Sequence, residues 1–164
     1  MTPDTAPAPA EASEFTVRRA QLDDLRVMAR LIGELFAIES DFRADPDKQY
    51  AGLKLLYEQH DAEILVAKHK NTAIGMVTMQ RVVSSAEGGY AGLIEDVVVR
   101  QGWRGQGIGS LLIGEAAALA KRHGYLRLQL GADAANAPAL SFYEKQGFCR
   151  SNLNLWYRAG LCDD

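Results

Sequence analysis

Four glycines stand within eight residues of this chain, immediately after a run of three valines. The glycines occupy positions 102, 105, 107 and 109, and the valines occupy positions 97 to 99. Valines favour an extended strand, whereas glycines allow a tight turn and a close approach of the main chain to a ligand. An Ala- and Leu-rich segment from residue 110 to 120 follows and is typical of a helix. The first amides of a helix lack intrahelical acceptors, so this stretch predicts an anion-binding site.

The spacing of these glycines excludes two common phosphate-binding loops. A dinucleotide fingerprint needs a third glycine where Ser110 stands, and a Walker loop needs a lysine that follows none of these glycines. The pattern that remains is Arg104-x-x-Gly107-x-Gly109, directly after the expected strand. This pattern resembles the signature of the GNAT superfamily of acyl-CoA-dependent N-acyltransferases. The alternative is a glycine-rich connection that binds no ligand.

A second stretch resembles the same superfamily. Asn136, Ala139, Tyr143, Gly147 and Phe148 match the pattern N-x-x-A-x-x-x-Y-x-x-x-G-F, and the two motifs stand in the superfamily's order and separation. The resemblance covers about residues 15–157. It implies the GNAT fold, which is an α+β fold with αβα layers, a mixed and mostly antiparallel central sheet, and about four flanking helices.

The resemblance also implies how acetyl-CoA, the co-substrate, would bind. The main chain of residues 97–99 would pair with the pantetheine arm, and the amides of residues 104–109 would hold the pyrophosphate. Arg104 would add charge-assisted hydrogen bonds to phosphate, unless it is only a solvated loop residue. Asn136 would contact the cofactor, or it caps a helix. The expected cofactor-binding residues are Val97, Val98, Val99, Arg104, Gly105, Gln106, Gly107, Ile108, Gly109, Ser110 and Asn136.

Glu95 and Asp96 interrupt the apolar strand that leads to the glycines. An amine acyltransferase needs a base, because an alkylamine has a pKa of about 10.4 and arrives protonated. Burying an unpaired carboxylate is costly, and adjacent strand residues point to opposite faces, so normally only one of the pair faces a cleft. The pair resembles that of diamine and other small-amine acetyltransferases, which implies Glu95 as the catalytic base, acting through water, and Asp96 as a structural residue.

Tyr143 stands where the superfamily places its general-acid tyrosine. A phenol with a pKa of about 10 suits proton donation to the departing thiolate. Aromatic packing beside Phe142 on a short helix is the alternative. The donor to the oxyanion is expected to be a backbone amide near Val98.

The composition indicates an ordinary soluble globular domain. The chain has 164 residues, of which 48% are hydrophobic and 24% charged, and its net charge of −3 argues against a general nucleic-acid binder. The two cysteines show neither metal-ligand spacing nor a disulfide framework, so no metal is expected. No apolar run reaches membrane-spanning length and no signal-peptide pattern is present, so we expect a cytoplasmic protein without a membrane partner.

The chain order predicts one domain at residues 14–158, between a disordered N-terminal tail at residues 1–13 and a short C-terminal tail at residues 159–164. The expected strands span residues 15–20, 64–68, 73–80, 90–99, 126–130 and 152–157, and the expected helices span residues 22–39, 45–60, 110–123 and 136–148.

Acidic residues in and between the first two expected helices are relevant to which amine accepts the acetyl group. They could attract a polyamine or another cationic amine, although a solvated helix face explains them equally well. We therefore expect acetyl transfer to a small-molecule primary amine by direct attack in a ternary complex, in a monomer or a homodimer. A protein lysine or N-terminal acetyltransferase and a non-catalytic acyl-CoA sensor are the alternatives. The acidic residues are Glu34, Glu39, Asp41, Asp45 and Asp47.

Overall fold

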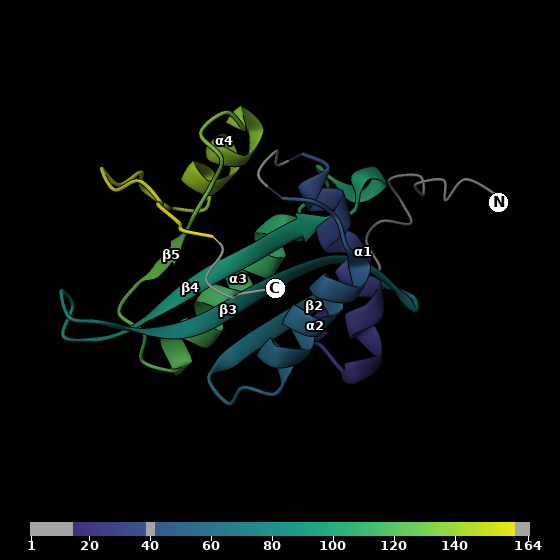
Figure 1. The fold of residues 1–164 in the computed structure, drawn as a ribbon, viewed down its shortest axis with the longest axis horizontal. Helices are drawn as coiled ribbons and strands as arrows, with labels where there is room; N and C mark the ends of the chain where they lie inside the picture. Colours follow the sequence, from purple (N-terminus) through teal and green to yellow (C-terminus); the bar gives the residue numbers. More distant parts are fainter. Residues whose placement is uncertain (1–14, 39–41, 160–164) are drawn as a thin grey trace. The chain divides into compact units, whose positions relative to one another are not determined.

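The computed structural model of the chain describes residues 15–38 and 42–159, and the structural statements that follow concern these residues. Most of the predicted elements are present, several with shifted ends (Figure 1). In chain order they are β1 (Phe15–Arg19), the 3-10 turn η1 (Leu22–Asp24), α1 (Leu25–Phe36), α2 (Pro46–Tyr57), β2 (Ala62–His69), β3 (Thr72–Ser84), β4 (Gly89–Val99), the 3-10 turn η2 (Gln101–Trp103), α3 (Ile108–Arg122), β5 (Leu128–Leu130) and α4 (Ala137–Lys145).

The described strands form one sheet in the order β1-β2-β3-β4-β5. The first four strands are antiparallel to their neighbours, and β5 runs parallel to β4. Helices α1 and α2 cover one face of this sheet and α3 covers the other (Figure 1). The close approach of α3 requires a glycine on β3, because a Cβ on Gly75 would lie 3.1 Å from Leu112 Cδ1. The expected α+β class with a mixed, mostly antiparallel sheet is confirmed.

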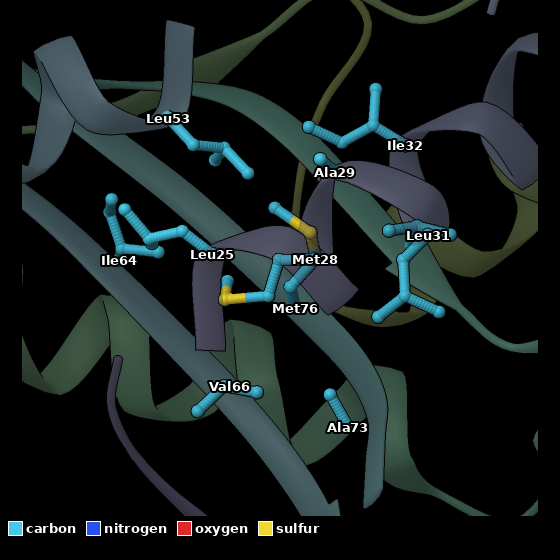
Figure 2. Packing of buried hydrophobic residues seen from close by; sticks show 11 residues of the cluster. Leu25, Met28, Ala29, Leu31, Ile32, Leu53, Ile64, Val66, Ala73 and Met76 are labelled. Carbon is cyan, nitrogen blue, oxygen red and sulfur yellow. The ribbon is translucent and has the colours of Figure 1, made fainter. Parts of the chain in front are cut away.

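The face that α1 and α2 cover holds a hydrophobic cluster (Figure 2). Apolar residues recur along α1 at steps of three and four, which places them on one side of the helix. Val98 of β4 and Met76 of β3 pack into the same cluster, and each such burial contributes about 1.5–3 kcal/mol. The buried side chain of Val98 therefore fixes which side chains of β4 point toward α1 and α2. The cluster consists of Leu25, Met28, Ala29, Leu31, Ile32, Leu53, Ile64, Val66, Ala73, Met76 and Val98.

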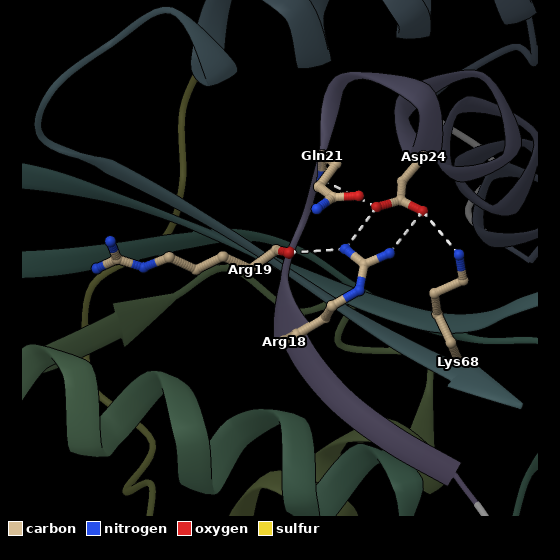
Figure 3. A network of polar contacts seen from close by, with 5 residues as sticks. All are labelled: Arg18, Arg19, Gln21, Asp24 and Lys68. Carbon is tan, nitrogen blue, oxygen red and sulfur yellow. Dashed lines mark hydrogen bonds and ion pairs between the residues drawn. The ribbon is translucent and has the colours of Figure 1, made fainter. Parts of the chain in front are cut away.

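Asp24 joins the start of α1 to the first two strands of the sheet (Figure 3). Its carboxylate accepts hydrogen bonds from Arg18 Nη1 at 2.7 Å, from Lys68 Nζ at 3.1 Å and from the amide of Gln21 at 2.8 Å. Burial opposes ionisation of this carboxyl, but the three hydrogen bonds and the charge of Arg18 outweigh it and lower the pKa of Asp24 to about 2. The ionised carboxylate thus stabilises the folded chain.

Replacing Asp24 with asparagine should cost stability in a pH-dependent way. The carboxyl has a lower pKa folded than unfolded, so its contribution is present above the unfolded pKa and is lost as the pH falls from about 4 towards 2. The linked free energy is about 2 kcal/mol at pH 7. Denaturant unfolding of wild type and Asp24→Asn at several pH values should show a gap of this size that narrows in acid. The exposed neighbour Asp23→Asn is the control, and a gap independent of pH would contradict this role of Asp24.

Two predicted elements differ from the structure. The helix expected at residues 22–39 is divided, with η1 preceding α1, and α1 ends at Phe36. The strand predicted at residues 152–157 is wrong, because this segment has no regular structure and no strand partner among the described residues. Its alternating pattern suits a strand, but Leu153, Leu155 and Tyr157 remain exposed and its main chain lacks the neighbour that a strand requires. Trp156 is exposed as well.

The chain divides into two compact units, residues 1–130 and residues 131–164. The described part of the first unit contains the whole sheet and helices α1 to α3. The described part of the second contains α4 and the irregular segment after it. The tails predicted at residues 1–13 and 159–164 lie outside the described residues, apart from Ala159.

Candidate active site

The strand β4 has neighbours on both edges over only part of its length. Residues 92–94 pair with residues 128–130 of β5, and this pairing ends at Ile94. Beyond the pairing, residues 97–99 remain in register with residues 75–77 of β3 on the other edge. Within the described part of the chain, no strand adjoins the β5-side edge of β4 after Ile94. We call this side of residues 97–99 the open edge of β4, because no described strand of the first unit pairs with it there.

A β-bulge interrupts β4 at Glu95 and Asp96. Ile94 pairs with Met79 and Val97 pairs with Val77, so one more residue lies between the pairs on β4 than on β3. Thr78 of β3 stands opposite this extra residue and is completely buried. Its Oγ1 accepts a hydrogen bond from the Asp96 amide at 3.0 Å and donates one to Asp96 Oδ2 at 2.8 Å. The sequence offered only a polar residue in an apolar run as a signal of this contact.

The bulge decides which main-chain groups face the open edge. Successive strand residues direct their N–H and C=O groups to opposite edges, so the amides of Gly92 and Arg100 would point the same way in a regular strand. Instead, the Gly92 amide donates to the Arg127 carbonyl on the β5 side, and the Arg100 amide donates to the Ile74 carbonyl of β3. The main chains of residues 97 and 99 therefore face the open edge. Of residues 97–99, for which pairing with pantetheine is predicted, Val97 and Val99 direct their main chains to that edge, whereas Val98 bonds to β3.

The two acidic residues at the bulge have different surroundings. Glu95 is exposed, whereas Asp96 is partly buried and its carboxylate is held by Thr78. Burial raises the pKa of Asp96, the hydrogen bond from Thr78 opposes the rise, and the charge of Glu95 adds to it. The rule that neighbouring strand residues face opposite sides does not apply at a bulge. The contacts, rather than strand alternation, distinguish these two carboxylates.

The glycine turn after β4 has the backbone that its sequence predicts. Gly105 and Gly107 have φ values of 76° and 82°, a region that favours glycine. Helix α3 begins at Ile108, directly after Gly107, rather than at Ser110 as expected. The amides of residues 105 to 109 have no acceptor within the described residues, as is usual at a helix start. The turn thus presents a row of amides suited to an anion.

Arg104 connects this turn to β4. Its Nε donates a hydrogen bond of 2.8 Å to the carbonyl oxygen of Val99, which agrees with the orientation of Val99 toward the open edge. The bond uses one of the five guanidinium donors. Gln106 also lies in the turn, where its Nε2 is 3.4 Å from the Gly102 carbonyl and its Oε1 is buried without a partner among the described residues.

Sequence reasoning missed the role of Glu34 in α1. Its Oε2 accepts a hydrogen bond from the amide of Gln101 at 3.1 Å, and its Oε1 lies 3.9 Å from Arg100 Nε. Asp45, another member of the predicted acidic group, caps α2 by accepting from the amides of residues 47 and 48. Glu39 and Asp41 lie outside the described residues. Of the three acids that the structure describes, Glu34 and Asp45 thus have structural contacts.

Tyr143 and Asn136 belong to the second unit, whereas Glu95 and the glycine turn belong to the first. Asn136 is the N-cap of α4, and its Oδ1 accepts from the Ala139 amide at 3.2 Å. This is the alternative that its sequence position had left open. The ring of Tyr143 packs at centroid distances of 5.3 Å from Phe142 and 5.9 Å from Phe148. The ring is thereby held in place on α4.

No group of three or more His, Cys, Asp or Glu side chains that could hold a metal ion occurs among the residues the structure describes. Over the same residues, no helix combines the length and the apolar character needed to cross a bilayer.

Comparison with known proteins places the chain in a family. The model of the acetyltransferase (GNAT) family matches residues 28–148. A transcriptional regulator from Bacillus halodurans C-125 has a similar structure, with a TM-score of 0.80, 28% identity, and coverage of 89% of this chain and 100% of that one. An aminoglycoside acetyltransferase from an uncultured soil metagenomic sample, solved in complex with sisomicin, shares the fold with a TM-score of 0.72 and 21% identity, covering 90% and 98% of the two chains.

A curated relative matches over a shorter stretch. Streptothricin acetyltransferase of Streptomyces lavendulae is 41% identical over 61 residues, which are 37% of this chain and 32% of the relative. The matched stretch thus spans about a third of each protein. The family model, in contrast, extends from within α1 to the end of the second motif and includes β4 and the glycine turn. The chain belongs to the acetyltransferase (GNAT) family.

Proposed function

We propose that this protein transfers the acetyl group of acetyl-CoA to a primary amine of a small molecule, by direct attack in a ternary complex. The observation that carries the proposal is the open edge of β4, which leads directly into a turn with a row of amides that have no acceptor within the described residues. An edge of this kind suits the amides of a pantetheine arm, as in strand addition, and the turn suits a pyrophosphate.

In this proposal, the main chains of Val97 and Val99 bind pantetheine, and the amides of residues 105–109 bind the pyrophosphate together with Arg104. Asn136, by contrast, is engaged as the N-cap of α4. The N–H of Val97 or Val99 stabilises the oxyanion, because both point to the edge where the thioester would lie.

The chemistry requires three proton transfers. One proton of the ammonium passes through water to Glu95, and the amine nitrogen then forms a bond to the acetyl carbonyl carbon. The carbon–sulfur bond breaks, the leaving thiolate takes a proton from the hydroxyl of Tyr143, and the surplus proton on the nitrogen passes through water to restore that hydroxyl. The exposure of Glu95 supports its role as base, since a solvated carboxylate can accept a proton through water.

The names of two similar proteins support a small-molecule amine as the acceptor of the acetyl group. Streptothricin acetyltransferase and the aminoglycoside acetyltransferase both carry names of small molecules as substrates. The test is the rate of CoA release from acetyl-CoA with aminoglycosides, streptothricin, amino sugars, polyamines, amino acids and peptides. Turnover with a small amine above the hydrolysis rate supports the proposal. Turnover with peptides alone, or CoA binding with no turnover on any amine, would contradict it.

Replacing Arg104 with alanine should weaken the binding of CoA by about 10-fold or more. The substitution removes the guanidinium and with it a charge-assisted hydrogen bond to phosphate. Such bonds contribute about 1.5–3 kcal/mol. Isothermal titration of CoA measures the affinity, and Arg122→Ala, an exposed arginine of α3, is the matched control. Equal affinity in the two variants would remove Arg104 from the site.

A further inference from the structure

We infer that Thr78 is a positioning residue of this site: its hydroxyl holds the bulge that exposes Glu95 and turns the main chains of Val97 and Val99 toward the open edge of β4. The effect on catalysis rests on the proposed function, whereas the effect on the strand does not. Thr78 lies on β3 and acts through β4.

The hydroxyl of Thr78 takes the place of a main-chain acceptor. In the regular ladder, the amide of a β4 residue that faces β3 bonds to a carbonyl oxygen, as the Arg100 amide does with Ile74. At the bulge, the Asp96 amide bonds instead to Thr78 Oγ1. The same oxygen donates its hydrogen to Asp96 Oδ2. Both the amide and the carboxylate of Asp96 are therefore held by one side chain from the neighbouring strand.

The location of the bulge is fixed from both ends. Ile94 and Val98 are 2% and 4% exposed, so neither can be turned to solvent without loss of core packing. A shift of the strand by one residue would move every side chain to the other face. The extra residue must therefore remain between these two anchors. Thr78 is the side chain that bonds to it there.

Removing the hydroxyl should loosen the bulge without changing the shape of the core. Valine has nearly the same volume as threonine but cannot bond to Asp96, whose amide and carboxylate would lose their partner. Glu95 precedes Asp96 in the bulge. If Asp96 lost its hydrogen bonds to Thr78, the position of the Glu95 carboxylate would become less defined. A misplacement of about 1 Å in a catalytic group can lower a rate by about 100-fold.

The first test needs no activity. Hydrogen exchange resolved by residue should show the Asp96 amide of the wild type as slow as the ladder amide of Val98. Thr78→Val should speed exchange of the Asp96 amide by about 10-fold or more, while Thr78→Ser, which keeps the hydroxyl, and Thr72→Val, an exposed position on the same strand, should not. Fast exchange of Asp96 in the wild type would overturn the inference even if Thr78→Val failed to fold.

The second test shows whether Thr78 acts through Glu95. With an amine that the wild type acetylates, Thr78→Val should lower kcat by about 10-fold or more, and Thr78→Ser should restore most of it. In a Glu95→Gln background, Thr78→Val should change kcat by less than about 2-fold, because residues that act together are not additive. Multiplying effects in the double variant would overturn the part of the inference that links Thr78 to Glu95. A wild type without turnover would instead refute the proposed function, and the exchange experiment would still decide the role of Thr78.

Discussion

Replacing Tyr143 with phenylalanine should lower turnover by about 100-fold or more, the usual scale for general-acid catalysis. The substitution removes one hydroxyl and keeps the ring that packs against Phe142 and Phe148, so α4 should remain folded. Without a proton donor the thiolate must leave as an anion, which raises the barrier for breaking the carbon–sulfur bond. The measurement is the rate of CoA release at saturating acetyl-CoA and amine.

The affinity for acetyl-CoA should hardly change in this variant, because the hydroxyl acts mainly in the transition state. Tyr157→Phe provides the matched control, since it removes a hydroxyl from an exposed tyrosine of the same unit. If Tyr143→Phe kept full turnover, Tyr143 would be a packing residue and the thiolate would take its proton from water.

The second large effect concerns the base. Glu95→Gln should lower turnover by about 100-fold or more near neutral pH, because glutamine cannot accept the proton of the ammonium. The loss should shrink at high pH, where a larger fraction of the amine is already unprotonated. A pH profile of kcat/KM for wild type and variant measures this.

Asp96→Asn is the informative partner of that variant. Asparagine keeps an oxygen that can accept from Thr78, so the main effect should be on stability rather than on turnover. Because burial raises the pKa of Asp96, the wild type loses stability relative to Asp96→Asn as the pH rises from the ordinary carboxyl range through the raised value. If a folded Asp96→Asn lost turnover and Glu95→Gln did not, the roles of these two residues would be reversed.

The sequence was a good guide where the structure depends on neighbours along the chain. The glycines after β4 predicted a turn into a helix, and the positive φ values of Gly105 and Gly107 agree with it. The helix end predicted at residue 123 and the capping position of Asn136 also agree with the end of α3 and the start of α4. These features are set by the local preferences of a few consecutive residues.

Features that depend on pairing between distant strands could not be predicted in this way. The bulge at Glu95 is one extra residue relative to β3, and it becomes visible only once the register with Thr78 is known. The contact of Glu34 with the Gln101 amide likewise joins residues that are far apart in sequence. The predicted strand at residues 152–157 had a suitable pattern, but a strand also requires a neighbour. Each of these features depends on a segment elsewhere in the chain, which the pattern of a single segment does not reveal.

Residue-resolved hydrogen exchange with and without acetyl-CoA tests the central claim most directly, namely that the open edge of β4 and the glycine turn hold this co-substrate. Acetyl-CoA should slow exchange at the amides of Val97 and Val99 and across residues 105–109, which have no acceptor in the described structure. The amide of Val98 should change little, because it faces β3. Protection elsewhere in the chain, with these amides unchanged at saturating acetyl-CoA, would contradict the account.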